Sequence, residues 1–142
     1  MPSGRKRQQP EIPLPTFFLD RGVGRHVVAD TVRARGCVAL PMADVYPSGT
    51  DQRVSDNEWI MRAGHEGRVP ITKDYSIIRD HAHDLRTSGL RVFAFNNASI
   101  SGHEMAERLD RHFNRILQRA AKPGPYVYVI GKDGLELRWP RD

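Results

Sequence analysis

The residues best suited to chemistry in this sequence are four aspartates at or near the ends of predicted strands, Asp20, Asp44, Asp56 and Asp74. Asp20 directly follows an apolar run, and Asp74 comes two residues after another. Asp56 falls in the first turn of a predicted helix, and Asp44 in the loop after a further strand. If the strands are parallel, their carboxyl ends share one edge of the sheet, where the four carboxylates would gather.

Carboxylates gathered without cations repel one another, and a divalent metal ion removes that repulsion. Mg²⁺ and Mn²⁺ prefer hard oxygen ligands, and Mg²⁺ usually keeps several waters while using only a few carboxylates. Such an ion can activate water and stabilise the departing oxygen of a phosphodiester. The pattern therefore predicts a Mg²⁺ or Mn²⁺ site with Asp20, Asp56 and Asp74 as catalytic ligands and Asp44 as a further acid.

Each aspartate also has a purely structural interpretation. Asp20 could cap the helix that follows it, and Asp74 could be a turn residue. Asp56 comes just after the predicted N-cap Ser55, where the helix dipole favours an acid by about 0.3–1 kcal/mol. Asp44 is compatible with an ordinary loop acid. The joint arrangement is more informative than any single member of the set.

Three basic residues, Arg21, Lys73 and Arg79, flank this acidic edge and could hold the phosphates of a nucleic acid. Each is equally compatible with a solvated surface charge. The net charge of +5 and the sequence pI of about 9.8 favour polyanionic partners such as RNA.

The sequence disfavours several other chemistries. The single cysteine, Cys37, lies in an apolar run, which argues against nucleophilic catalysis and excludes a multi-cysteine zinc site. The histidines form no His-Glu-x-x-His metal-binding motif, and we expect His81 and His83 to be solvated. The sequence also has no glycine-rich phosphate loop, which disfavours nucleotide hydrolysis. A phosphohydrolase or phosphoacceptor domain also places aspartates at parallel strand ends, but the residues after Asp20 lack the Asp-x-Asp pair of one such class.

Short apolar runs and helical periodicity alternate along the chain from residue 17 to about residue 120. Continuous apolar runs suit strands that are covered on both faces, as in a parallel sheet. We expect strands at 17–19, 37–40, 69–72, 91–95, 126–130 and 135–139. We expect helices at about 23–36, 55–67, 76–88 and 101–122, and a loop at 42–49. This order predicts an α/β fold, a mostly parallel sheet with helices on both faces and a C-terminal β-hairpin.

The composition fits one domain. The 142 residues, 39% of them hydrophobic, suffice for one sizeable core. Residues 1–15 are basic and rich in proline, so we expect a flexible tail there and a single domain at 16–142. No apolar run nears the roughly 20 residues of a membrane-spanning helix, and no apolar stretch follows the first basic residues as in a secretory signal. We therefore expect a cytoplasmic protein with no membrane partner.

With these residues in view, the chain resembles the PIN-like domains, specifically the short VapC-related group of bacterial toxin–antitoxin loci. The likeness runs from about residue 17 to residue 140. It rests on motifs in order: Phe17-Phe18-Leu19-Asp20-Arg21, Gly24, Ala43-Asp44-Val45-Tyr46, Asp56-x-Glu58-Trp59-Ile60, Thr72-Lys73-Asp74, Ile78-Arg79, Gly124-Pro125-Tyr126-Val127-Tyr128 and Leu137-x-Trp139-Pro140. Any one of these motifs alone would be a weak signal, whereas their order is specific.

The resemblance implies a three-layer α/β/α sandwich with a parallel central sheet and Mg²⁺- or Mn²⁺-dependent endoribonuclease activity. The acidic positions of the family fall on Asp20, Asp56 and Asp74, and an additional acidic position of the subgroup falls on Asp44. Thr72 matches a hydroxyl position that steadies the site. The implied partners are RNA, a cognate antitoxin protein and a second copy of the chain in a homodimer.

The sequence departs from the family pattern directly after Asp74. Many PIN-like domains have a further acid there, whereas Tyr75 and Ser76 follow here; Asp80 or Asp84 could substitute from the next helix. The departure and the basic tail keep open a second hypothesis, a non-catalytic PIN-like module that binds nucleic acid or a protein. Such a module would bind RNA in a salt-dependent manner but without regard to Mg²⁺.

Overall fold

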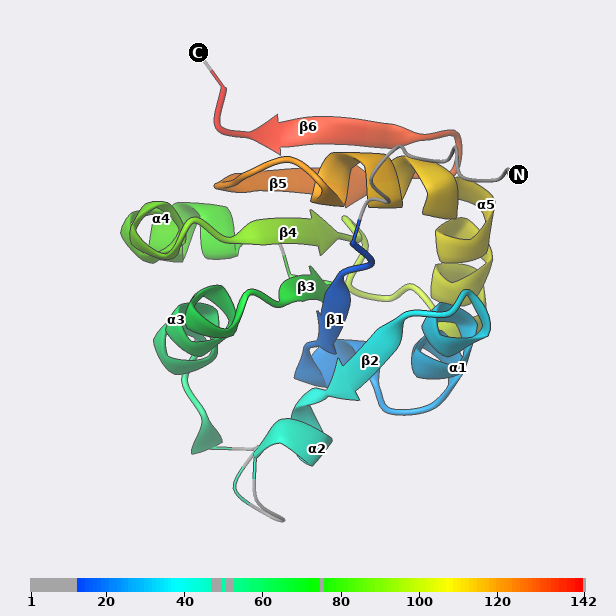
Figure 1. The fold of residues 1–142 in the computed structure, drawn as a ribbon, viewed down its shortest axis with the longest axis horizontal. Coiled ribbons are helices and arrows are strands. Elements are labelled where there is room, and N and C mark those ends of the chain that lie inside the picture. Colours follow the sequence, from blue (N-terminus) through cyan, green and yellow to red (C-terminus); the bar gives the residue numbers. More distant parts are fainter. Residues whose placement is uncertain (1–12, 47–49, 51–52, 75, 142) are drawn as a thin grey trace, which may run out of the picture.

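Six strands form one sheet in the computed structural model, which describes residues 13–46, 50, 53–74 and 76–141. The strands are β1 (Thr16–Leu19), β2 (Val38–Pro41), β3 (Val69–Thr72), β4 (Arg91–Ala94), β5 (Tyr126–Ile130) and β6 (Leu135–Trp139). Their order is β2-β1-β3-β4-β5-β6, with β1 to β5 parallel and β6 antiparallel to β5 (Figure 1). The predicted mostly parallel sheet and C-terminal hairpin are confirmed.

Helices cover both faces of this sheet (Figure 1). They are α1 (Val27–Ala34), α2 (Met42–Val45), α3 (Asp56–Glu66), α4 (Ile77–Ser88) and α5 (Gly102–Ala120), with a short 3₁₀ helix η2 (Arg21–Val23) after β1. Helices α1 and α5 pack together on one face, and α3 and α4 pack together on the other. The predicted three-layer α/β/α sandwich is therefore confirmed.

The apolar run of β1 is buried on both faces of the sheet, as the sequence indicated. Phe17 and Leu19 face the core under α1 and α5, whereas Phe18 faces the core under α3 and α4. Phe18 stacks on Trp59 of α3, with ring centroids 5.4 Å apart. Burying each such side chain stabilises the fold by about 1.5–3 kcal/mol, so β1 is anchored firmly on both sides.

Local capping sets the bounds of α3 and therefore the place of Asp56. The Ser55 hydroxyl accepts the backbone N–H of Glu58 at 3.2 Å, as expected for the N-cap of a helix. The helix ends at Gly67, which adopts a left-handed conformation with φ of 71° that an L-residue with a side chain adopts less readily. Asp56 is consequently the first residue of α3, at the end nearest the carboxyl edge of β1 and β3.

The structure differs from the sequence-based expectation in two connections. The first helix begins at Val27, because η2 and Gly24, with φ of 89°, occupy the segment after β1. Val27 itself is 39% exposed, whereas Val28 and Val32 of the same helix are buried. The predicted loop at 42–49 begins with the short helix α2, and residues 47–49 lie outside the described part of the chain.

The predicted N-terminal tail lies outside the described residues except for residues 13–15. The division into a tail at 1–15 and a domain at 16–142 stays a prediction. Among the helices that the structure describes, none is long and apolar enough to cross a bilayer.

Candidate active site

The aspartates that follow β1 and β3 lie on either side of the point where the strand order reverses. The chain passes from β1 to β2 on one side and returns to β3 on the other. In open parallel sheets, ligands bind outside the carboxyl ends of the strands at such a point. Asp20 directly follows β1 and Asp74 comes two residues after β3, so the fold places both at this edge.

A buried threonine connects these two aspartates. Thr72 is the last residue of β3, and its exposed fraction is 0%. Its hydroxyl donates to Oδ2 of Asp20 at 2.6 Å and accepts the backbone N–H of Asp74 at 3.0 Å. The backbone N–H of Arg21 donates to Oδ1 of Asp20 at 2.6 Å. The Asp20 carboxylate is therefore held in one orientation through both of its oxygens.

The third carboxylate, that of Asp56, is held by side chains of α3 and α4. The indole Nε1 of Trp59 donates to Oδ1 of Asp56 at 3.0 Å. Nε2 of His81 lies 3.7 Å from Oδ2 of Asp56, and Nδ1 of His81 lies 3.4 Å from Oδ2 of Asp84. Asn57 also donates to Oδ2 of Asp84, at 2.8 Å. His81 therefore lies between two carboxylates, and the prediction that it is simply solvated is wrong.

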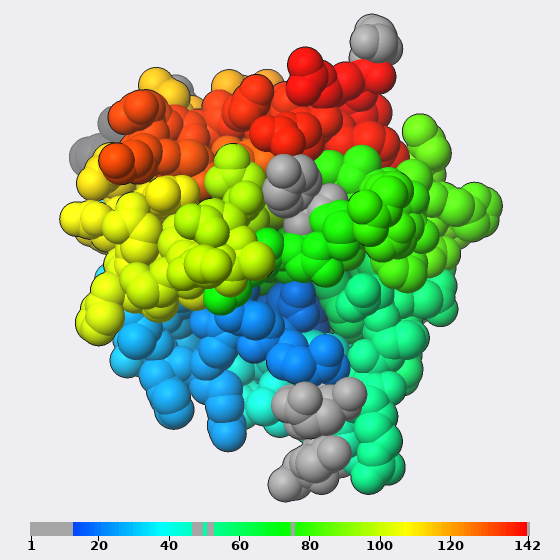
Figure 2. Space-filling view, turned by 180° about the vertical axis from the view of Figure 1, so that it is seen from behind, coloured from blue at the N-terminus to red at the C-terminus, as the bar shows by residue number. Residues whose placement is uncertain are grey.

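Asp20, Asp56 and Asp74 line one hollow of about 490 Å³, which we call the acidic hollow. The other described residues that line it are Arg21, Gly22, Lys73 and Ala98. Figure 2 shows the face on which the segments after β1 (blue), β3 (green) and β4 (yellow-green) meet. The acidic hollow thus combines three carboxylates with two cations at the carboxyl edge of the sheet.

Burial raises the pKa of Asp20 above its ordinary value of 3.8. The hydrogen bonds from Thr72 and from the backbone of Arg21 favour the ionised form and oppose this shift, whereas the negative charge of Asp56 adds to it. The positive charge of Arg21 also favours the ionised form, but desolvation outweighs it. A cation at this position would supply further positive charge.

The donor set of the acidic hollow suits a hard divalent cation, because its acidic groups are all carboxylates. Both hydrogen bonds that Asp74 accepts from Ser76 fall on Oδ1. Within the described part of the chain, however, no three acidic, histidine or cysteine side chains lie close enough to hold a metal ion directly. A cation in this hollow would need water molecules to complete its shell, as Mg²⁺ usually does.

Comparison with known proteins identifies the family. A family model described as a PIN-like domain matches residues 15–97, more than half of the chain. This chain belongs to the PIN-like domain family. The matched stretch contains Asp20, Asp56 and Asp74 together with Thr72 and His81, which contact them. The three carboxylates of the acidic hollow therefore all lie inside it.

A curated relative supports the same assignment. The protein of Mycobacterium tuberculosis named "Putative ribonuclease VapC45" is 31% identical to this chain over 117 residues. The aligned region covers 80% of this chain and 84% of that protein. The predicted membership of the VapC-related PIN-like group is therefore confirmed. No solved structure matches the chain.

Two of the predicted site residues lie away from the acidic hollow of this PIN-like domain. Asp44, in α2, pairs with Arg25 at 3.0 Å, and it is not among the described residues that line the acidic hollow. Arg79, in α4, donates two hydrogen bonds to its neighbour Asp80, of 2.7 and 3.0 Å, and lines a second hollow. The structure therefore brings together the three main aspartates but not Asp44.

Sequence reasoning missed three residues near the site of this PIN-like domain, His81, Asn96 and Arg138. Asn96 follows the fourth predicted strand, so the strand-end rule that located Asp20 would also have located it. Arg138 comes from the antiparallel strand β6, whose place beside the site depends on the sheet order. His81 interrupts the helical conformation of α4 with φ of −134° and ψ of 29°, and no local sequence pattern signals that interruption.

Proposed function

We propose that this PIN-like protein is a metal-dependent endoribonuclease that cleaves RNA phosphodiesters and acts as the toxin of a toxin–antitoxin pair. The observation behind the proposal is the shared placement of Asp20, Asp56 and Asp74 around one hollow. The ribonuclease name of the relative from Mycobacterium tuberculosis supports this activity. The net charge of +5 supports a polyanionic substrate.

The residues of the chain would position the reaction. Mg²⁺ or Mn²⁺ would supply positive charge against the phosphodiester and lower the pKa of water. Asp20, Asp56 and Asp74 would hold the ion, and the hydrogen bond from Thr72 would keep the Asp20 carboxylate in a fixed orientation for it. Lys73 lies on the wall of the acidic hollow, where its charge can receive a substrate phosphate. Little else is required of the protein, because holding the reacting groups in line is itself a large part of catalysis.

The proposed partners follow from the VapC-related family. RNA is the proposed substrate, and a cognate antitoxin protein is the proposed inhibitor. A homodimer and a cytoplasmic location stay predictions, as does a supporting role for Asp44 in metal binding.

Cleavage of a mixed RNA pool tests the proposal directly. Wild type, Asp20→Asn and Asp74→Asn are compared in Mg²⁺, Mn²⁺ and EDTA, with Asp30→Asn as a control because that exposed acid lies on α1. We expect cleavage by wild type and Asp30→Asn in metal only, and none by the other two variants. Full cleavage by folded Asp74→Asn, or equal cleavage in EDTA, would refute the proposal.

A second candidate function is a non-catalytic PIN-like module that binds nucleic acid or a protein. It is favoured by the finding that no three described acidic, histidine or cysteine side chains are close enough to hold a metal ion directly. RNA binding that depends on salt but not on Mg²⁺, without cleavage in any metal, would support this function. Deleting residues 1–15 should then weaken RNA binding markedly if the basic tail is the contact.

A further inference from the structure

A second hollow lies directly beside the acidic one. Its volume is about 550 Å³, within the range of roughly 300–1,000 Å³ that is typical of ligand sites. Lys73, Asp74 and Ala98 line both hollows, so the two spaces meet at the end of β3. The other described residues that line the second hollow are Ser76, Ile78, Arg79, Asn96 and Arg138.

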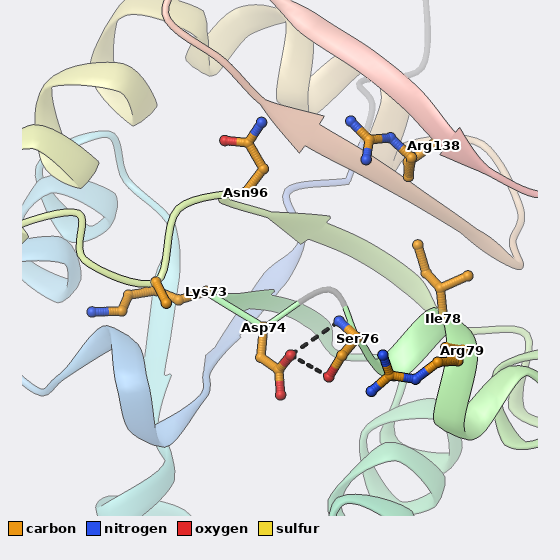
Figure 3. A pocket seen from close by; sticks show the side chains of 8 residues that line it. Lys73, Asp74, Ser76, Ile78, Arg79, Asn96 and Arg138 are labelled. Atoms are coloured by element: carbon orange, nitrogen blue, oxygen red, sulfur yellow. Dashed lines mark hydrogen bonds between the residues drawn. The ribbon is translucent and has the colours of Figure 1, made fainter.

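Figure 3 shows that the side chains of this hollow come from opposite sides. Asn96, from the segment after β4, and Arg138, from β6, lie on one side. Ile78 and Arg79 of α4 lie on the other, and Asp74 lies on the same side as these two, beside Ser76. The second hollow therefore opens onto the carboxylate that it shares with the acidic hollow.

The lining offers apolar surface, hydrogen-bonding groups and positive charge. Ile78 and Ala98 provide the apolar surface. The exposed amide of Asn96 can donate and accept hydrogen bonds. The guanidinium of Arg138 is planar, and its side chain is only 26% exposed, with Glu136 at 3.4 Å. A planar cation that is partly fixed loses little freedom when it binds a ligand.

We propose that the second hollow binds one unpaired nucleotide of the RNA next to the cleaved phosphodiester. The inference rests on the proposed function, because it takes RNA as the substrate of the adjoining acidic hollow. A nucleotide combines a flat base, polar base edges and a phosphate, and the lining presents a counterpart to each. The base would lie against Ile78 and the guanidinium of Arg138, and Asn96 would bond to its edge.

The nucleotide must be unpaired because a base within a duplex is stacked and has its Watson–Crick edge occupied. Proteins that read RNA by sequence mostly bind single-stranded segments, whose bases can leave the stack and be hydrogen-bonded by side chains. Asn96 and Arg138 would therefore select the position of cleavage, whereas the aspartates would carry it out.

Fluorescence anisotropy with the full chain in EDTA tests this inference without cleavage. The probes are a labelled single-stranded RNA of mixed sequence and the same RNA annealed to its complement. Asn96→Ala and Arg138→Gln are compared with wild type and with Arg115→Gln, an exposed arginine of α5. We expect each of the first two variants to weaken single-strand binding by about tenfold, the loss of one good base contact. Arg115→Gln should bind as wild type does.

Two results would overturn the inference. One is single-strand binding by Asn96→Ala that equals wild type, since this exposed position should not affect folding. The other is duplex RNA bound by wild type as tightly as the single strand. Cleavage by wild type in Mn²⁺ is measured in parallel. Unchanged binding with cleavage present would refute only the nucleotide site, whereas weakened binding with no cleavage in any metal would refute only the nuclease.

Discussion

The hydroxyl of Thr72 donates a hydrogen bond of 2.6 Å to the carboxylate of Asp20 across two neighbouring parallel strands. The same hydroxyl accepts the backbone N–H of Asp74, at 3.0 Å. One buried oxygen atom therefore fixes the relative position of two acids that are far apart in the sequence. This relationship means that the geometry of the acidic hollow depends on a residue that is itself not a proposed metal ligand.

Thr72→Val should therefore reduce cleavage while the side chain keeps its shape. Valine fills the same space but leaves Oδ2 of Asp20 and the N–H of Asp74 without the hydroxyl. We expect the cleavage rate to fall by about 10²-fold, because a small misplacement of the reacting groups costs about that much in rate. We expect unfolding to become easier by about 1–3 kcal/mol in urea, because buried polar groups lose their partner. Thr72→Ser, which retains the hydroxyl, should stay close to wild type; a Thr72→Val enzyme of full activity would contradict the prediction.

The raised pKa of Asp20 predicts how stability depends on pH in EDTA. An acid whose pKa is higher in the folded state favours folding most below its unfolded value of 3.8. That contribution is lost as pH rises through the folded pKa. The melting temperature of wild type relative to Asp20→Asn should therefore fall as the pH rises from 3.8 through the folded pKa. Asp30→Asn, at an exposed site, measures the general effect of removing one charge.

Metal binding should reverse this destabilisation at neutral pH. A ligand that binds only the folded state raises stability by RT ln(1 + [L]/Kd), about 2.7 kcal/mol at 100 times Kd. Thermal melting in Mn²⁺ and in EDTA measures the difference. We expect Mn²⁺ to raise the melting temperature of wild type by several degrees and that of Asp20→Asn much less. An equal rise in both proteins would show that the ion does not bind at Asp20.

His81 should act as a positioning residue for Asp56. Its ring lies 3.7 Å from Asp56 and 3.4 Å from Asp84, so it can hold the first carboxylate in place. His81→Leu should lower kcat by about tenfold and raise the Mn²⁺ concentration needed for half-maximal cleavage. His81→Gln should restore part of both, because glutamine can still donate a hydrogen bond. His83→Leu, on the same helix but exposed, should behave as wild type.

The close approach of α3 to α4 should make Gly64 sensitive to any side chain. A Cβ atom at this position would lie 2.5 Å from Cβ of Ser88 and 2.9 Å from its carbonyl oxygen. Gly64→Ala should therefore destabilise the fold by about 1–3 kcal/mol, despite the better helix propensity of alanine. Gly102→Ala in α5 is the control, because its Cβ would meet Val27 at an ordinary 3.6 Å. Urea denaturation measures both, and a neutral Gly64→Ala would contradict the packing described here.

The elements of the fold were largely predictable because their signals are local. Apolar runs located every strand of the described sheet to within a residue or two, and Ser55 located the start of α3. The connections were less predictable. Pro70 lacks a backbone N–H, which is typical of an edge strand or of the start of a strand, yet β3 lies between β1 and β4 with Pro70 as its second residue. Strand order arises from long-range packing, which no local pattern records.

The candidate site was predictable only where strand ends determine it. The rule that parallel strands share a carboxyl edge located Asp20 and Asp74, and helix capping located Asp56. Asp44 also follows a strand of this sheet, but its carboxylate pairs with Arg25, and the sequence alone does not predict that ion pair. His81 was missed because its contact with Asp56 joins α4 to α3, and such a contact between helices leaves no local sequence pattern.

The match to the family model ends at residue 97, whereas Arg138 lies on β6. The acids and one wall of the second hollow thus belong to the family stretch, and the opposite wall belongs partly to the C-terminal hairpin. Sequence change in that hairpin could alter which RNA is bound without disturbing the acids. The proposed reaction and the proposed choice of RNA would thus depend on different segments of the chain.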